Sequence, residues 1–239
     1  MNTNNLPIQP PKFLWFLTLA YTMVLISANW FDARLIQIFG LNMDAGTLIF
    51  PLTFLLADLI TEVYGYKHAR QTIWAGFLFN TLFILYGQLV IHLPSPPYST
   101  NNDLFASILH INTRIIFASI ISYFIAEPWN SYLISKLKIT MHGRFMGIRF
   151  ILSTMVASGI DSFTFGFIAF YGMFNINNLI GLILTMWFIK VLVEILGLPI
   201  SILTANKLKA IEKMDIYDIG TKYNFFRLEN NYEQNTNQY

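Results

Sequence analysis

Six long runs of apolar residues constrain this chain more than any other feature of its sequence. A helix needs about 20 mostly apolar residues to cross the hydrocarbon core of a bilayer. Of the 239 residues, 55% are hydrophobic and only 12% are charged, against about 25% charged in a soluble domain. The pattern predicts an all-α polytopic membrane protein with six transmembrane helices. The runs extend over residues 13–31, 46–64, 71–93, 114–135, 149–173 and 179–205.

The second run is the least regular of the six. Pro51 lies early in this run, and Gly65 follows its end. Proline interrupts the hydrogen bonding of a helix interior, and glycine commonly ends helices. We therefore expect a kinked or half-length helix there, as found beside the solute sites of many transporters.

Basic residues are distributed unevenly between the two sides of the predicted bundle. With a cytoplasmic N-terminus, the cytoplasmic segments hold 11 of the 15 Lys and Arg residues, and only Arg34 lies opposite. Cytoplasmic loops carry the excess of basic residues, which predicts that both termini are cytoplasmic (N-in/C-in) in the cell inner membrane. The domains would be a short tail (1–12), the transmembrane domain (13–205) and a partly disordered cytoplasmic tail (206–239).

Several kinds of chemistry are excluded by the sequence. The chain has no cysteine, which rules out disulfides, thiolate metal sites and thiol nucleophiles. It lacks the motifs of P-loop nucleotide hydrolysis, of serine hydrolases and of zinc proteases. An aspartate dyad of Asp58 and Asp161 would be the remaining enzyme chemistry, but neither lies in the sequence context of an intramembrane protease. We predict a protein that is not an enzyme and needs no cofactor or metal ion.

Charged residues inside the spans need an explanation. A charge at mid-bilayer costs about 2.5–3.5 kcal/mol on insertion scales, so six unpaired charges would cost on the order of 15–20 kcal/mol. That cost is as large as the stability of a whole domain. The side chains must therefore face a shared interior, pair with one another or be neutral. They are Asp58, Glu62, Glu127, Asp161, Lys190 and Glu194.

Two pairs of these residues share a helix face through i, i+4 spacing. Asp58 and Glu62 place two carboxylates close together, which favours proton uptake by one of them. Both are proton-coupling candidates, although Glu62 could instead lie at the cytoplasmic interface beside the basic residues that follow it. Lys190 and Glu194 are expected to form a structural ion pair, with ligand contact as the alternative for Lys190.

Asp161 has no basic residue within reach on its own helix, so its partner must come from another helix or from a ligand. Glu127 and Asn130 are three residues apart, as are Ser158 and Asp161 in the next span. The two neighbourhoods form a faint internal repeat, and such repeats often meet at the central site of a transporter. Packing between small residues is the alternative explanation.

Three stretches resemble a known family. Phe50–Arg70 (FPLTFLLADLITEVYGYKHAR) is similar to the signature of the queuosine precursor transporters, which belong to the vitamin uptake transporters, and the similarity continues through Ile148–Gly172 and Phe188–Pro199. Members often carry Gln-x-x-Asp where this chain has Glu127 and Asn130. The resemblance implies six spans, an inner-membrane location and import of deazaguanine bases, such as 7-cyano-7-deazaguanine or 7-aminomethyl-7-deazaguanine, for tRNA queuosine salvage.

The chain also resembles the substrate-binding (S-component) subunits of energy-coupling-factor importers. That resemblance implies the alternative function, a subunit that binds a vitamin or purine and needs a separate ATPase module. In the leading interpretation, no ATPase module is required. The partners are then a deazapurine substrate and the lipid bilayer, without nucleic acid, and a homo-oligomer is left open.

The family resemblance suggests how the buried acids are used. A guanine-like edge presents a ring N–H and an amino group, and a carboxylate can accept both. Aromatic rings would hold the flat base by stacking. Asp161 and Glu127 are expected to read the edge, with Asn130 and Ser158 beside them. The remaining candidates are Asp58 as a proton carrier or contact, Lys190 as its counter-charge, Asn29 as a weaker contact, and Trp129 or Phe163 as the stacking ring.

Overall fold

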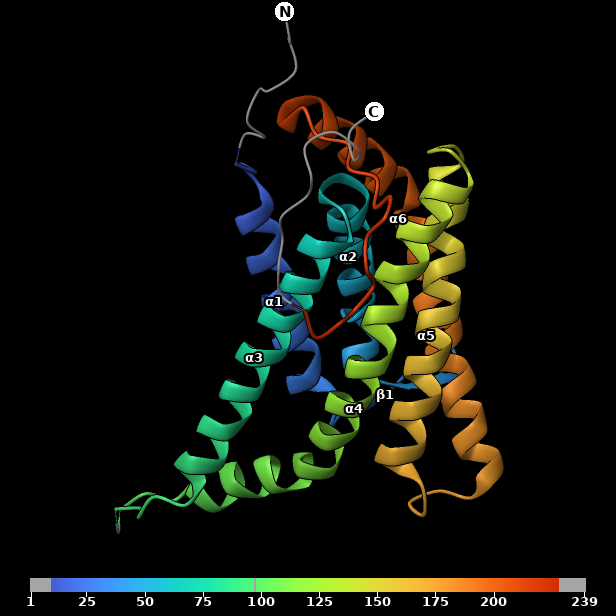
Figure 1. The fold of residues 1–239 in the computed structure, drawn as a ribbon. Coiled ribbons are helices and arrows are strands. Elements are labelled where there is room, and N and C mark those ends of the chain that lie inside the picture. Colours follow the sequence, from blue (N-terminus) through green and yellow to red (C-terminus); the bar gives the residue numbers. More distant parts are fainter. Residues whose placement is uncertain (1–9, 97, 228–239) are drawn as a thin grey trace, which may run out of the picture.

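Six helical segments of the described residues, each long and apolar enough to cross a membrane, form a single bundle (Figure 1), and the second of them, Gly46–Tyr64, combines a 3₁₀ turn with a short helix. The computed structural model is described over residues 10–96 and 98–227, without the side chains of residues 110–113. The predicted all-α polytopic membrane fold is confirmed. Its helices are α1 (Leu14–Phe31), α2 (Pro51–Tyr64), α3 (Tyr66–Ile91), α4 (Asn102–Thr140), α5 (Met146–Phe170) and α6 (Ile176–Glu212).

The second span is a short helix at the centre of the bundle. A 3₁₀ turn, η1 (Gly46–Leu48), precedes α2. Pro51 then lies in the first turn of α2, where its missing N–H leaves no intrahelical bond unmade. Gly65 ends the helix with a φ of 82°, which glycine adopts without strain. This 14-residue helix agrees with the predicted half-length helix.

The surroundings of α2 determine where its two acids lie. The helix contacts each of the other five long helices, and 11 of its 14 residues are buried. Asp58 and Glu62 are among the buried residues. The fold thus removes both carboxyl groups from lipid by placing protein around them.

The fourth and sixth helices are longer than the spans predicted from the apolar runs. They contain 39 and 37 residues and have a proline in their interior, Pro128 in α4 and Pro199 in α6. The first turns of α4 run across the lower end of the molecule, and the last turns of α6 lie across the upper end (Figure 1). The exposed Leu104, Phe105 and Ile108 on those first turns of α4 are typical of a helix at the membrane interface.

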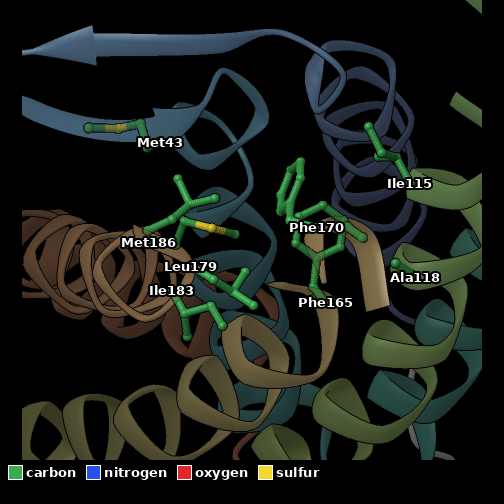
Figure 2. Close-up of a cluster of buried hydrophobic side chains, with 10 residues drawn as sticks. Met43, Ile115, Ala118, Phe165, Phe170, Leu179, Ile183 and Met186 are labelled. Atoms are coloured by element: carbon green, nitrogen blue, oxygen red, sulfur yellow. The ribbon is translucent and has the colours of Figure 1, made fainter. Parts of the chain in front are cut away.

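A small hairpin that the sequence analysis did not predict connects α1 to η1. Strands β1 (Leu35–Ile38) and β2 (Leu41–Asp44) pair antiparallel, with Leu35 opposite Asp44. Phe39 and Gly40 both have positive φ, as the central residues of a type I′ turn require. The hairpin places Met43 over an apolar cluster formed with α4, α5 and α6, which includes Phe165, Phe170 and Met186 (Figure 2).

The chain after α6 returns along the bundle between α3 and α4 (Figure 1). Trp74 Nε1 donates to the carbonyl oxygen of Phe225 at 2.9 Å, and the two rings stack with centroids 5.3 Å apart. Asp218 Oδ2 accepts from the hydroxyl of Ser135 at 2.6 Å. The described part of the predicted tail is therefore packed on the helices, and residues 228–239 lie outside the described residues.

Close packing of α5 on α6 yields a first prediction. A Cβ added at Gly166 would overlap with Cγ1 of Ile183, whereas at Gly181 it would have no heavy atom within 4 Å. Gly166→Ala is expected to lower the free energy of unfolding by about 1–3 kcal/mol, the typical cost of overpacking. Gly181→Ala is the matched control and is expected to be neutral or slightly stabilising. Thermal unfolding in detergent compares the two variants, and equal midpoints would contradict the prediction.

Candidate functional site

The interior of the bundle contains fully buried polar side chains contributed by four helices. We call six of them the central cluster. Together, these six side chains have eight buried oxygen atoms that make no hydrogen bond of normal geometry with any described residue. Buried polar atoms are usually hydrogen-bonded, so a group of free acceptors marks a place where a ligand can bind. The central cluster consists of Asp58 from α2, Glu127 and Asn130 from α4, Thr154 and Ser158 from α5, and Glu194 from α6.

Asp58 lies in the middle of the central cluster. Its Oδ1 accepts a hydrogen bond of 2.7 Å from Asn130 Nδ2, and its Oδ2 has no partner among the described residues. The carboxyl groups of Glu127 and Glu194 are close enough to interact with it electrostatically. The structure therefore brings Asp58, Glu127 and Asn130 together, as the sequence analysis expected.

A buried ion pair lies beside the central cluster. Lys190 Nζ of α6 is 2.5 Å from Asp161 Oδ2 of α5, and both side chains are 4% exposed. The partner of Asp161 thus lies on another helix, which is one of the two sources that the sequence analysis allowed. Ser158 lies one turn before Asp161 on the same buried face of α5.

The pairing of Lys190 corrects two expectations from the sequence. Lys190 does not pair with Glu194, whose carboxylate oxygens have no hydrogen-bonding partner among the described residues, and it is not the counter-charge of Asp58. An i, i+4 pair on one helix contributes only about 0.3–0.5 kcal/mol. Attraction between two desolvated charges on facing helices is stronger, which favours the pair with Asp161.

The Asp161–Lys190 pair lines a small cavity on the hairpin side of the central cluster, with room for about one water molecule. Phe50 and Phe165 also line this cavity, and Lys190 Nζ lies 4.8 Å from the centre of the Phe50 ring. Asp32, just beyond the end of α1, faces it as well. Burial raises the pKa of the Asp32 carboxyl, and the nearby carboxylate of Asp44 raises it further.

The two aromatic residues expected to stack on a ligand lie elsewhere. Trp129 is 47% exposed and Phe163 is 42% exposed, so both point away from the interior. Each follows a buried acid by two positions, and residues two apart on a helix do not share a face. Phe50 and Phe165 are the aromatic rings that the structure places at the cavity. Helical spacing could have indicated Phe165, because it follows Asp161 by one turn.

Asn29 is buried near the end of α1. Its Oδ1 accepts a hydrogen bond from the hydroxyl of Ser119 on α4. Ser119 also lines the cavity beside Asp161 and Lys190. Asn29 therefore supports the wall of the cavity through Ser119.

Glu62 belongs to a separate ion network at the end of the bundle where α6 ends. Its Oε1 lies 2.6 Å from Lys209 Nζ, 3.0 Å from Arg149 Nη2 and 3.8 Å from Lys138 Nζ. Asp215 adds a second carboxylate, 2.6 Å from Lys138 and 2.9 Å from Lys209. Glu62 is thus the common counter-charge of three cations from three helices. This geometry supports a structural role for Glu62 over the predicted role in proton coupling.

A bundle of six apolar helical segments with free polar acceptors in its interior places this chain among the multi-pass membrane proteins. A family model described as "Putative vitamin uptake transporter" matches residues 44–204. The chain belongs to this family. Comparison with solved structures finds no match.

Two relatives are similar over most of their length. A "Probable queuosine precursor transporter" of Bacillus subtilis (strain 168) is 25% identical over 177 residues, which cover 73% of this chain and 76% of the relative. A "Queuosine precursor transporter" of Escherichia coli (strain K12) is 27% identical over 163 residues, covering 67% and 70%. Both names describe transporters, which confirms the prediction that this chain is not an enzyme.

Proposed function

We propose that this protein imports queuosine precursors, deazaguanine bases such as 7-cyano-7-deazaguanine or 7-aminomethyl-7-deazaguanine, for tRNA queuosine salvage. It would do so across the cell inner membrane, with both termini in the cytoplasm and without an ATPase module. The observation that carries this proposal is Glu127. It is fully buried, and neither of its carboxylate oxygens accepts a hydrogen bond of normal geometry from the described residues, although the hydroxyls of Tyr21 and Thr53 lie nearby. The relatives of the chain are named for queuosine precursors.

The chemistry of Glu127 matches the edge of such a base. A guanine-like ring offers a ring N–H and an exocyclic amino group side by side, and the two oxygens of one carboxylate accept both. Ser158 carries a free hydroxyl, and Asn130 carries a free amide oxygen. These groups extend the set of contacts available to a flat, polar ring. Phe50 and Phe165 at the neighbouring cavity are the rings suited to stack on it.

Entry of the base requires the bundle to move. The cavity beside Asp161 holds about one water molecule, which is far smaller than a bicyclic base. The helices around it must therefore separate to admit the substrate. Such alternating exposure of a central site to the two sides of the membrane is the general mode of secondary transporters.

The test uses a bacterial strain that can neither make nor import the base and that contains no energy-coupling ATPase module. Expression of this chain, with base supplied in the medium, is expected to restore queuosine in tRNA, measured by mass spectrometry of digested tRNA. Glu127→Gln is expected to reduce this restoration at least about 10-fold, because the amide keeps one acceptor and turns a donor toward the donor edge.

Ile125→Ala, on the lipid-exposed face of α4, is the matched control and is expected to behave as the wild type. Absence of queuosine despite normal amounts of protein in the membrane would contradict the proposal. Restoration that appears only when an ATPase module is supplied would favour the alternative, a substrate-binding subunit.

A further inference from the structure

Asp58 and Glu194 form a pair of buried carboxyl groups without a cation of their own. Both side chains are fully buried, and their carboxyl groups are close enough to interact directly. Within the described part of the chain, neither carboxyl has a basic group within ion-pair distance. Three of their four oxygens make no hydrogen bond of normal geometry with a described residue.

The cations in the neighbourhood are engaged with other acids. Lys190 lies one turn from Glu194 on α6, but its ammonium group contacts Asp161 at 2.5 Å. Arg149 of α5 contacts Glu62, one turn from Asp58, at 3.0 Å. Each of these cations therefore already compensates another buried carboxylate.

The other polar groups facing the pair do not supply positive charge. Glu127 of α4 adds a third acid, and Tyr21 of α1 interacts with Glu127. The buried basic residue of α3, Arg70, contacts another part of the chain, because its Nη1 donates to the carbonyl oxygen of Asn224 at 2.7 Å, in the segment after α6. Two adjacent carboxylates in a low-dielectric interior repel each other strongly. At least one of them must therefore be neutral, which requires a bound proton.

The amide of Asn130 contacts one acid of the pair and keeps a free acceptor. Its Nδ2 donates to Asp58, while its Oδ1 is buried and has no partner among the described residues. The hydroxyl of Thr154 is close to Glu194 and is likewise free of a normal hydrogen bond. A protonated carboxyl is a hydrogen-bond donor, so free acceptors beside the pair suit a proton that is held by either acid.

We propose that Asp58 and Glu194 together bind one proton and that this pair couples import of the base to the proton gradient. The inference rests on the proposed function and concerns its driving force. While the pair is open to one side of the membrane, a carboxylate takes up a proton and becomes a carboxylic acid. While the pair is open to the other side, the same O–H bond breaks and the proton is released. Asp161 and Glu127, which interact electrostatically with each other, continue the series of acids from Asp58 toward the cavity on the hairpin side.

The test uses the purified full chain in liposomes with 7-cyano-7-deazaguanine as the substrate. The membrane potential is clamped at zero, and the solution outside the liposomes is one pH unit more acidic than the solution inside. A dye inside the liposomes reports the internal pH. With one proton per neutral base, the wild type is expected to accumulate the base about 10-fold, since each tenfold concentration ratio corresponds to 1.4 kcal/mol. The dye should report proton entry with the base, and a protonophore should abolish the accumulation.

Glu194→Gln mimics the protonated acid permanently. It is expected to lose accumulation, so that the ratio of base inside to base outside falls from about 10 to about 1, and the exchange of labelled for unlabelled base that remains should no longer depend on the pH gradient. Asp58→Asn is a second variant expected to lose the response to the gradient. Asp103→Asn, an exposed acid in the first turn of α4, is the control and is expected to accumulate base as the wild type does.

The outcomes separate the inference from the proposed function. Wild-type uptake that ignores the pH gradient, or that follows a sodium gradient instead, would overturn proton coupling and leave base import standing. Wild-type accumulation in Glu194→Gln would also overturn it. A wild type that neither exchanges nor accumulates the base would instead contradict the proposed function.

Discussion

Asp161→Asn is expected to lower the free energy of unfolding by about 3–5 kcal/mol, because it leaves the Lys190 ammonium as an uncompensated buried charge. Both side chains of this pair are almost completely buried, and the two charged atoms are 2.5 Å apart. Lys190→Met should have a cost of similar size, since it leaves the Asp161 carboxylate unpaired. Reversible unfolding in mixed detergent micelles measures both variants.

The double variant Asp161→Asn/Lys190→Met distinguishes pairing from general damage to the core. With both charges removed, no buried charge is left uncompensated, so most of the stability should return. The coupling energy is the difference between the stability effect of the double variant and the sum of the two single effects. It should exceed about 0.3–0.5 kcal/mol, the limit seen for independent sites. Simple addition of the two single effects would show that the pair does not exist. Import should remain lost in the double variant, because the contact of Asp161 with the edge of the base, which the sequence analysis predicts, is gone.

Glu62→Gln is expected to be the most damaging single change in the ion network at the end of α6. Glu62 Oε1 is the counter-charge of Lys209 at 2.6 Å and of Arg149 at 3.0 Å, and both Glu62 and Arg149 are fully buried. Removing this charge leaves the buried Arg149 without a counter-charge among the described residues, while Lys138 and Lys209 keep Asp215. The expected cost is about 3–5 kcal/mol. Loss of folded protein in size-exclusion chromatography and a lower unfolding midpoint are the measurements.

Two other acids provide comparisons for the loss of stability in Glu62→Gln. Asp215 contacts Lys138 and Lys209 but is 29% exposed, so Asp215→Asn should cost only about 1 kcal/mol. Asp103 is exposed, and Asp103→Asn should change stability by no more than about 0.5 kcal/mol. The predicted order of the three stability losses thus follows the burial of the three acids. If Glu62→Gln were as mild as Asp103→Asn, the network would not stabilise the fold.

The acids of this interior differ in what surrounds them. Glu62 lies among three cations from neighbouring helices, and Asp161 has a single cation to itself. Glu127, Asp58 and Glu194 have no cation within ion-pair distance among the described residues and retain oxygens without a normal hydrogen bond. An acid surrounded by cations, as Glu62 is, suits a structural role. Acids with free oxygens, such as Glu127, Asp58 and Glu194, suit the binding of a base or a proton. The environment of Asp161 is intermediate, because it has one cation as a partner. Its ion pair can serve both stability and recognition.

Local sequence determined the membrane-spanning parts of this protein. The length of each apolar run is sufficient to indicate a span, because the thickness of the bilayer sets the length of helix required. Pro51 and Gly65 defined the half-length α2 in the same way, since each acts on the backbone at its own position. The cost of burying charge also showed that the acids need partners, whatever the fold.

Only the tertiary structure decided which partners these acids have. Lys190 pairs with Asp161 across two helices, and Glu194 comes to lie beside Asp58 instead. Trp129 faces outward, while Phe50 lines the cavity. The spacing of residues gives the faces of one helix, but the contacts between faces depend on how helices distant in sequence pack together. The apolar runs therefore indicate how often the chain crosses the membrane, and packing around α2 decides where the free polar acceptors lie together.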